Sequence, residues 1–111
     1  MKRYAVVPHP GFQEDVRRET RWWMERDPSR AEAIVDVIQE ASILVRRFPE
    51  IGPPVAIRRH PNANARHLVL ARTGYVLTYE VEHDRQRVVL IRLRHEKQRP
   101  LRSERRRPPK P

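Results

Sequence analysis

Apolar residues recur at helical spacing in the first half of this chain and alternate with polar residues in the second half. The strongest helical pattern is carried by Ala31, Ile34, Ile38, Ala41, Val45 and Phe48. These steps of three and four residues place one apolar stripe along about five helical turns, which we interpret as core packing. Asp27 is expected to cap the free N–H groups at the start of this helix, with Pro28 in its first turn. Pro49 is expected to end it.

A shorter helix is predicted before it, over residues 12–25, after an edge strand at residues 4–7. Its row near helical spacing consists of Phe12, Val16, Thr20 and Trp23. Glu14 and Asp15 are expected to complement the positive end of the helix dipole. Trp23 is expected to face the core, whereas Trp22 points elsewhere and is either exposed for a partner or partly buried.

The second half predicts strands at residues 55–58, 67–71, 75–82 and 87–94, with corners at residues 73–74 and 83–86. In the third of these strands, the face expected to pack on the helices carries Tyr75, Leu77, Tyr79 and Val81. In the fourth, the expected core face carries Val89, Ile91 and Leu93, and the opposite face carries Val88, Leu90, Arg92 and Arg94. Two guanidinium groups are therefore expected on the exposed side of the sheet.

This order of elements predicts an α+β fold: an N-terminal strand, a two-helix hairpin and then a three- to four-stranded antiparallel sheet. Residues 1–100 are expected to form one domain, because the chain of 111 residues is too short for two separate cores. Residues 101–111 form a basic, proline-rich tail with little apolar surface to bury. The tail is expected to be disordered.

The charge balance narrows the classes of partner. The chain has 24 Lys and Arg residues against 14 Asp and Glu, a formal net charge of +10, which favours polyanions or an acidic protein as partners. Cysteine is absent, which excludes disulfides, thiolate nucleophiles and cysteine-bound metals. No apolar run approaches the roughly 20 residues of a membrane span, and the N-terminus does not match a signal peptide. We therefore expect a cytoplasmic protein without a membrane partner.

Several local features are arranged as in one known family. Arg66 opens a strand before a short turn, Tyr75 and Tyr79 lie in the next strand, Asp84 lies at the following corner, and the last strand ends in His95 followed by Gln98. Together with the helical hairpin, this set resembles the RelE/ParE toxins of type II toxin-antitoxin systems, over residues 3 to 101. The resemblance implies a growth-inhibiting toxin neutralised by a cognate antitoxin, whose C-terminal segment wraps over it.

The two branches of that family imply different targets. RelE-like toxins enter the ribosomal A site and cleave mRNA with basic residues and a C-terminal tyrosine, whereas ParE-like toxins act on DNA gyrase and need no nuclease site. Cleavage without a metal requires groups that move protons and stabilise the phosphorane, and the candidates here are His95, Lys97 and Arg66. However, the RelE pattern expects an arginine where this chain has Val76, and no tyrosine follows Tyr79.

We therefore favour a ParE-like toxin that inhibits DNA gyrase without chemistry of its own. The residues expected to bind the target or the antitoxin are Arg58, Arg59, Arg66, Arg92, Arg94, His95, Lys97 and Gln98. The arginines fit either a polyanion or an acidic antitoxin, and His95 is alternatively a strand-end residue with only local hydrogen bonds. No metal or cofactor is expected, since His60 and His67 have no carboxylate at ligand spacing. Two alternatives stay open: a RelE-like ribosome-dependent mRNA endoribonuclease, and a non-toxic basic module that binds nucleic acid.

Overall fold

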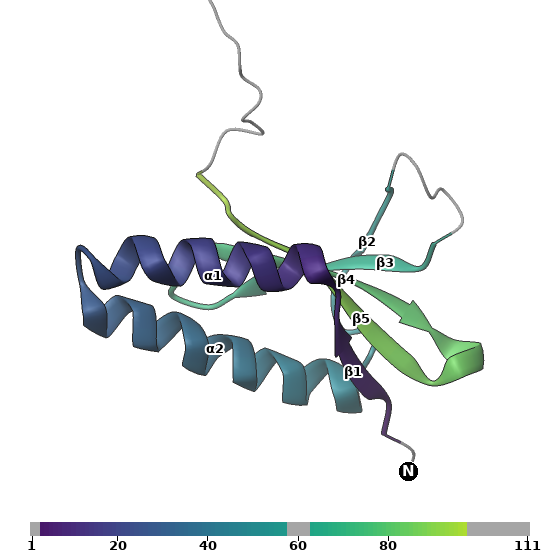
Figure 1. Cartoon of the computed structure of the whole chain (residues 1–111). Helices are drawn as coiled ribbons and strands as arrows, with labels where there is room; N and C mark the ends of the chain where they lie inside the picture. Colours follow the sequence, from purple (N-terminus) through teal and green to yellow (C-terminus); the bar gives the residue numbers. More distant parts are fainter. Residues whose placement is uncertain (1–2, 58–62, 98–111) are drawn as a thin grey trace, which may run out of the picture.

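The computed structural model describes residues 3–57 and 63–97 and places a helical hairpin against one sheet (Figure 1). The elements are β1 (Ala5–Pro8), α1 (Pro10–Met24), α2 (Pro28–Arg47), β2 (Pro54–Val55), β3 (Ala65–Leu70), β4 (Tyr75–Glu82), the short 3-10 helix η1 (His83–Arg85) and β5 (Arg87–His95). The predicted α+β fold is confirmed. The division into a domain of residues 1–100 and a tail of residues 101–111 stays a prediction, because residues 98–111 lie outside the described part.

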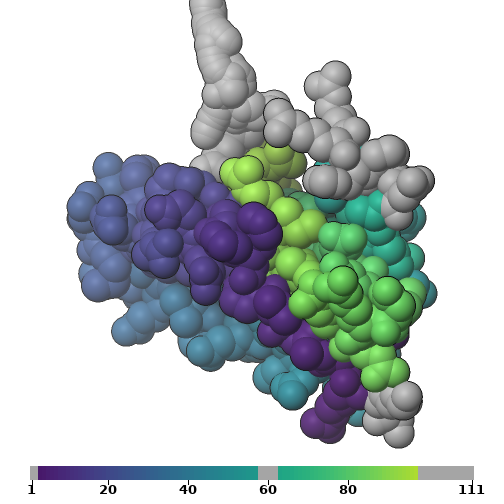
Figure 2. Space-filling model, turned by 45° about the vertical axis from the view of Figure 1, so that its right-hand side comes forward, coloured from purple at the N-terminus to yellow at the C-terminus, as the bar shows by residue number. Residues whose placement is uncertain are grey.

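The sheet has the strand order β1-β5-β4-β3-β2 and is mixed. The four strands from β2 to β5 pair antiparallel, as expected, and β1 adds a parallel fifth strand along β5. Figure 2 shows the purple N-terminal segment lying against the green β4–β5 hairpin. Because β1 leads directly into α1, this pairing also fixes where the helical hairpin begins on the sheet.

The helix α2 begins at Pro28 as predicted and α1 begins at Pro10, two residues before the predicted range, but the capping of both helices differs from expectation. At the start of α1, the His9 side chain accepts a hydrogen bond from the Gly11 backbone N–H at 3.0 Å. Glu14 and Asp15 lie beyond the first turn, so the predicted interaction with the helix dipole is wrong. Asp27 precedes α2 without a side-chain bond to its backbone, because its carboxylate accepts from the Ser29 hydroxyl at 2.7 Å instead. The predicted capping role of Asp27 is therefore also wrong.

The core lies between the hairpin and one face of the sheet. Its buried members are Phe12, Ile34, Ala41, Val45, Leu70, Tyr75, Leu77, Tyr79, Val81, Val88, Leu90 and Leu93. The predicted core face of β4 is confirmed, since its residues alternate strictly between buried and half-buried. The predicted stripe on α2 is confirmed from Ala31 to Val45. The periodicity of apolar residues therefore identified most of the core residues of α2 and β4.

Phe48 departs from that stripe. α2 ends at Arg47, and the Phe48 backbone adopts φ −129° and ψ 76°, so its side chain leaves the helical row. It is 49% exposed, and the prediction that it packs in the core is wrong.

The predicted core face of β5 is wrong over its first half. Val88 and Leu90 are buried, whereas Val89 and Ile91 are only half-buried. The register explains this, because Tyr79 pairs with Leu90 while the preceding Thr78 pairs with Arg92. Ile91 is thus an extra residue in a β-bulge, and a bulge reverses the alternation of faces. Beyond it, Leu93 is buried as predicted.

Candidate functional site

The sheet face opposite the helices includes two neighbouring cross-strand rows of side chains, and Glu80 lies on the same face one row further along β4. One row joins His67, Thr78 and Arg92, and the other joins Val69, Val76 and Arg94. We call these six residues the open sheet face. Val69 is 63% exposed, and the side chains of Arg92 and Arg94 are exposed as predicted. The bulge at Ile91 sets this geometry, because it directs both arginines away from the core.

Arg92 is held by a carboxylate of α1. Its Nε donates to Asp15 Oδ2 at 2.8 Å, and the Leu93 backbone N–H donates to the same oxygen at 2.9 Å. Arg18 donates to the other oxygen of Asp15 at 3.0 Å. Asp15 is 2% exposed, and these three donors satisfy the hydrogen-bonding capacity of its buried carboxylate group. Much of the charge of Arg92 is therefore used within the fold.

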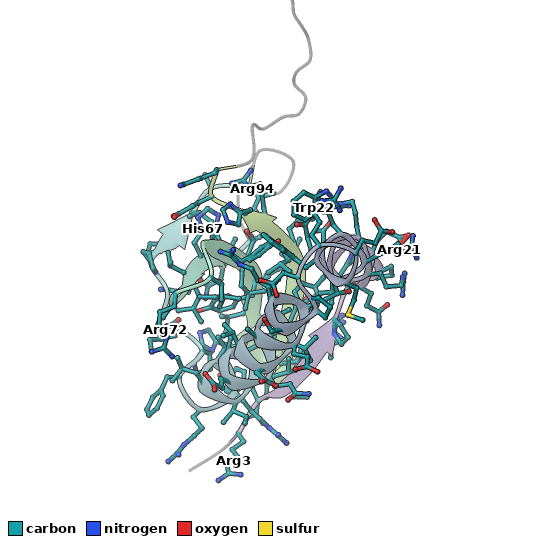
Figure 3. The ribbon with its side chains drawn as sticks, turned by 90° about the vertical axis from the view of Figure 1, so that its left-hand side faces the viewer. Arg3, Arg21, Trp22, His67, Arg72 and Arg94 are labelled. Carbon is teal, nitrogen blue, oxygen red and sulfur yellow. The ribbon has the colours of Figure 1, made fainter. Side chains whose placement is uncertain are left out.

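Arg94, unlike Arg92, is not engaged by a carboxylate of the fold. Within residues 3–57 and 63–97, no carboxylate lies within ion-pair distance of it. Figure 3 shows Arg94 and His67 near each other at the same end of the sheet. Burial, together with the positive charge of Arg94, lowers the pKa of His67 below its usual value. At neutral pH, His67 is therefore uncharged and offers a hydrogen bond, while Arg94 supplies the cation.

Arg66 lies apart from this face and acts as a structural clamp. Its Nη1 donates to the Gly52 carbonyl at 2.7 Å and to the Glu50 carbonyl at 3.2 Å, and its side chain is only 17% exposed. The Gly52 N–H in turn donates to the Tyr79 hydroxyl at 3.0 Å. Arg66 therefore holds the segment before β2 against β3.

His95 lies on the helix-covered side of the sheet. Its ring packs edge-on against Tyr75, with 4.9 Å between the ring centres, and its Nδ1 accepts from the Lys97 N–H at 3.1 Å. Tyr75 pairs with His95 and Tyr79 pairs with Arg66, which separates the two candidates by four residues along β4, or about 13 Å. The candidate nuclease residues His95 and Arg66 are therefore not brought together.

Of the remaining residues expected to bind the target or the antitoxin, the structure describes only Lys97. Lys97 is exposed at the end of the described chain. Arg58, Arg59 and Gln98 lie outside the described residues. Trp22 is 47% exposed, with the guanidinium of Arg26 3.8 Å from its ring centre, so the exposed alternative holds for Trp22.

A buried polar network between α1 and β4 was missed at the level of sequence. Tyr75 donates to Glu19 at 2.6 Å, and the Trp23 indole N–H donates to the Tyr75 hydroxyl at 3.0 Å. Burial, and then the hydrogen bond to Glu19, raise the pKa of Tyr75. A signal was present, because Asp15 and Glu19 follow Phe12 at steps of three and four residues and so share its buried face.

Two classes of site are not found in the part of the chain that the structure describes. No group of three or more His, Cys, Asp or Glu residues there is arranged to hold a metal ion. No helix there is both long and apolar enough to span a membrane. What the described residues do offer is the open sheet face, on which Arg94 lies beside the apolar Val69 and Val76.

Comparison with known proteins agrees with this architecture. The family model for the ParE toxin of the type II toxin-antitoxin system, parDE, matches residues 6–100. Toxin RelE3 of Caulobacter vibrioides is 29% identical over 91 residues, which cover 82% of this chain and 92% of that protein. The RelBE2 toxin-antitoxin complex of Mycobacterium tuberculosis contains a chain with a similar fold, at a TM-score of 0.54 and 21% identity, covering 84% of this chain and 98% of that one.

Proposed function

Because this chain belongs to the ParE toxin family of type II toxin-antitoxin systems, we propose that it inhibits DNA gyrase by binding it. In this proposal, the cognate antitoxin keeps the toxin inactive until the toxin is released. The open sheet face makes the contact with gyrase, and Arg94 supplies its main charge. No bond is made or broken by the toxin itself.

The observation that carries this proposal is Val76 at the centre of the open sheet face. The RelE resemblance expects an arginine at this position, directly after Gly74-Tyr75, and Val76 instead lies between Val69 and Arg94. An aliphatic side chain cannot stabilise the charge of a phosphorane or move a proton. An apolar centre beside an arginine is, however, suited to a protein surface.

The positions of the tyrosines support the same conclusion. The hydroxyls of Tyr75 and Tyr79 are engaged with Glu19 and Gly52 inside the fold, and burial raises the pKa of both. A raised pKa makes the phenolate harder to form, so neither group suits a general base. His67, the histidine of the open sheet face, shares its row with Thr78 and Arg92 and has no carboxylate in that row.

Purified toxin tests the proposal directly. Wild-type protein is expected to inhibit gyrase supercoiling of relaxed plasmid, and Arg94→Ala is expected to need roughly tenfold more protein, equivalent to about 1.4 kcal/mol. Arg21→Ala removes the same charge from an exposed position on α1 and is the matched control (Figure 3). Normal supercoiling at saturating wild-type toxin would defeat the proposal. Equal potency of the two variants would exclude the open sheet face as the contact.

A RelE-like endoribonuclease is the second candidate, and His95 with the adjacent Lys97 is the observation that favours it. This candidate predicts new cuts at A-site codons in translated messages, and the loss of these cuts in His95→Ala. Toeprinting on translating ribosomes measures both. A third candidate, a non-toxic module that binds nucleic acid, predicts normal growth when the chain is expressed without its antitoxin.

A further inference from the structure

A hollow of about 660 Å³ lies where three distant segments meet, at the end of α2. We call it the Phe48 pocket, and besides Pro49 it is lined by Tyr4, Arg47, Phe48, Glu50, Ile51 and His83. Figure 1 shows the last turn of α2 beside the start of β1, at one corner of the molecule. The pocket is separate from the open sheet face, since none of those six residues belongs to that face.

The pocket exposes two large apolar side chains, Phe48 and Ile51. Phe48 is 49% exposed and Ile51 is 46% exposed, although both follow directly on the buried stripe of α2. A short turn, in which the Ile51 N–H donates to the Phe48 carbonyl at 3.1 Å, holds both residues at the rim. Large apolar side chains placed side by side at a hollow are typical of a protein contact.

Hydrogen bonds between distant segments hold the polar wall in place. The Tyr4 hydroxyl and His83 Nδ1 are 2.6 Å apart, and His83 Nε2 is 2.7 Å from a carboxylate oxygen of Glu50. The bond to His83 comes first among the causes that lower the pKa of Glu50, whose charge is therefore retained and paired at neutral pH. Asn64 and Arg66 also contact Glu50, at 3.4 and 3.8 Å. The wall is thus ordered before any partner arrives, which reduces the entropy lost on binding.

The rim of the pocket is positively charged. The guanidinium of Arg47 lies 5.8 Å from the Phe48 ring centre, and within the described residues no carboxylate is within ion-pair distance of it. Arg46, the residue before it in α2, is also exposed, and its carbonyl accepts from the Tyr4 N–H at 3.3 Å. Arg3 is exposed at the same edge of the molecule, where Figure 3 shows it pointing outward. An apolar hollow with an unneutralised cationic rim favours an acidic partner with an apolar anchor.

We propose that the Phe48 pocket receives a bulky aliphatic or aromatic side chain from an acidic segment of the cognate antitoxin. This inference rests on the toxin-antitoxin assignment and not on the identity of the target. A second copy of the chain is disfavoured, because two proteins of charge +10 repel each other. A nucleic acid is disfavoured, because the exposed Phe48 and Ile51 offer apolar contacts to a side chain and no contact to phosphates.

Binding of the purified antitoxin to purified toxin variants, by calorimetry or interferometry, tests the pocket. Phe48→Ala and Ile51→Ala are each expected to raise the Kd by tenfold or more. Ile43→Ala is the matched control, because Ile43 is 60% exposed on α2 outside the pocket, and its effect is expected to stay within about threefold. Circular dichroism melts confirm that each variant is folded. Equal Kd values for Ile51→Ala, Ile43→Ala and wild type would overturn the proposal.

Charge reversal tests the chemistry of the occupant. Arg47→Glu is expected to weaken antitoxin binding by about tenfold in low salt and by less in 0.5 M salt, where surface charges are screened. In a scan of acidic-to-lysine changes across the antitoxin, one position is expected to restore the affinity of Arg47→Glu while weakening that of wild type. Absence of any such position would refute an acidic occupant. Loss of binding to single-stranded RNA without loss of antitoxin binding would instead identify a nucleic-acid site and also overturn the proposal.

The gyrase assay separates this inference from the proposed function. Phe48→Ala and Ile51→Ala are expected to inhibit supercoiling as strongly as wild type but to resist neutralisation by the antitoxin. If wild-type toxin leaves gyrase active while the pocket variants still lose antitoxin binding, the gyrase proposal fails and the pocket stands. If gyrase is inhibited and the pocket variants are neutralised normally, the pocket fails and the gyrase proposal stands.

Discussion

The buried carboxylate of Asp15 joins α1 to β5, and its removal is the sharpest test of how this fold is held together. Beyond Leu90, β1 no longer pairs with β5, so the edge of β5 needs another partner. Asp15 takes that place by accepting from the Leu93 N–H at 2.9 Å and from Arg92 at 2.8 Å. At this edge, the carboxylate of a residue on α1 therefore accepts the backbone hydrogen bond that a neighbouring strand would otherwise accept.

The expected loss of stability follows from these contacts. Breaking a buried ion pair by removing one partner typically costs about 3–5 kcal/mol. Here the side chains of Arg92 and Arg18 are 62% and 54% exposed and can be rehydrated, whereas the Leu93 N–H remains buried without an acceptor. We therefore expect Asp15→Ala to lower the free energy of unfolding by about 2–3 kcal/mol. The smaller loss expected for Asp15→Asn, about 1–2 kcal/mol, reflects an amide oxygen that can still accept from Leu93.

Urea unfolding followed by tryptophan fluorescence measures the free energy of unfolding of each variant. In thermal melts, the loss expected for Asp15→Ala should lower the Tm by roughly 10 °C in a domain of this size. Glu14→Ala is the matched control, since its carboxylate pairs with Arg17 at the surface, where both side chains are more than 60% exposed. Its effect is expected to stay within about 0.5 kcal/mol. If Asp15→Ala and Glu14→Ala are equally stable, the account of the α1–β5 junction is wrong.

Two further predictions concern the open sheet face and the segment before β2. The folded-state pKa of His67 is lowered, so the unfolded chain binds more protons and stability should fall as the pH drops below about 6.5. A histidine NMR titration should give a pKa below that of a free histidine, rising in Arg94→Ala; an unchanged value in that variant would remove Arg94 as a cause. Gly52→Ala should destabilise the fold by about 1–3 kcal/mol or more in thermal melts, because a Cβ there would lie 2.0 Å from the His67 carbonyl oxygen. Wild-type stability of Gly52→Ala would show that this segment can move away from β3.

Features that depend on neighbours in the sequence were predicted well. The stripe on α2 and the buried face of β4 were predicted because apolar residues recur in the sequence with the helical period of 3.6 residues and the strand period of 2 residues. The start of α2 was also well placed, because Pro28 stands in its first turn, whereas α1 begins at Pro10, two residues before the predicted range. The α+β class and the family resemblance rest on this same ordered series of elements.

Features that depend on distant contacts were mistaken or missed. The core face of β5 was misassigned because the bulge at Ile91 arises from its pairing with β4, and no local pattern marks an extra residue. The burial of Asp15 and Glu19 was missed because a carboxylate is ordinarily placed at the surface. Their partners Arg92 and Tyr75 lie 77 and 56 residues away in the chain.

The amino-acid sequence by itself determined the order of the elements, the apolar faces of α2 and β4, and the excess of positive charge. Only the tertiary structure decided which arginines remain available to a partner: Arg92 is engaged by Asp15 and Arg66 by the Gly52 carbonyl, whereas Arg94 and Arg47 have no carboxylate partner among the described residues. The physical reason is that the net charge follows from the number of charged residues alone, wherever they lie in the fold. Neutralisation instead requires two groups within about 4 Å, and in a chain this long such pairs are created by folding.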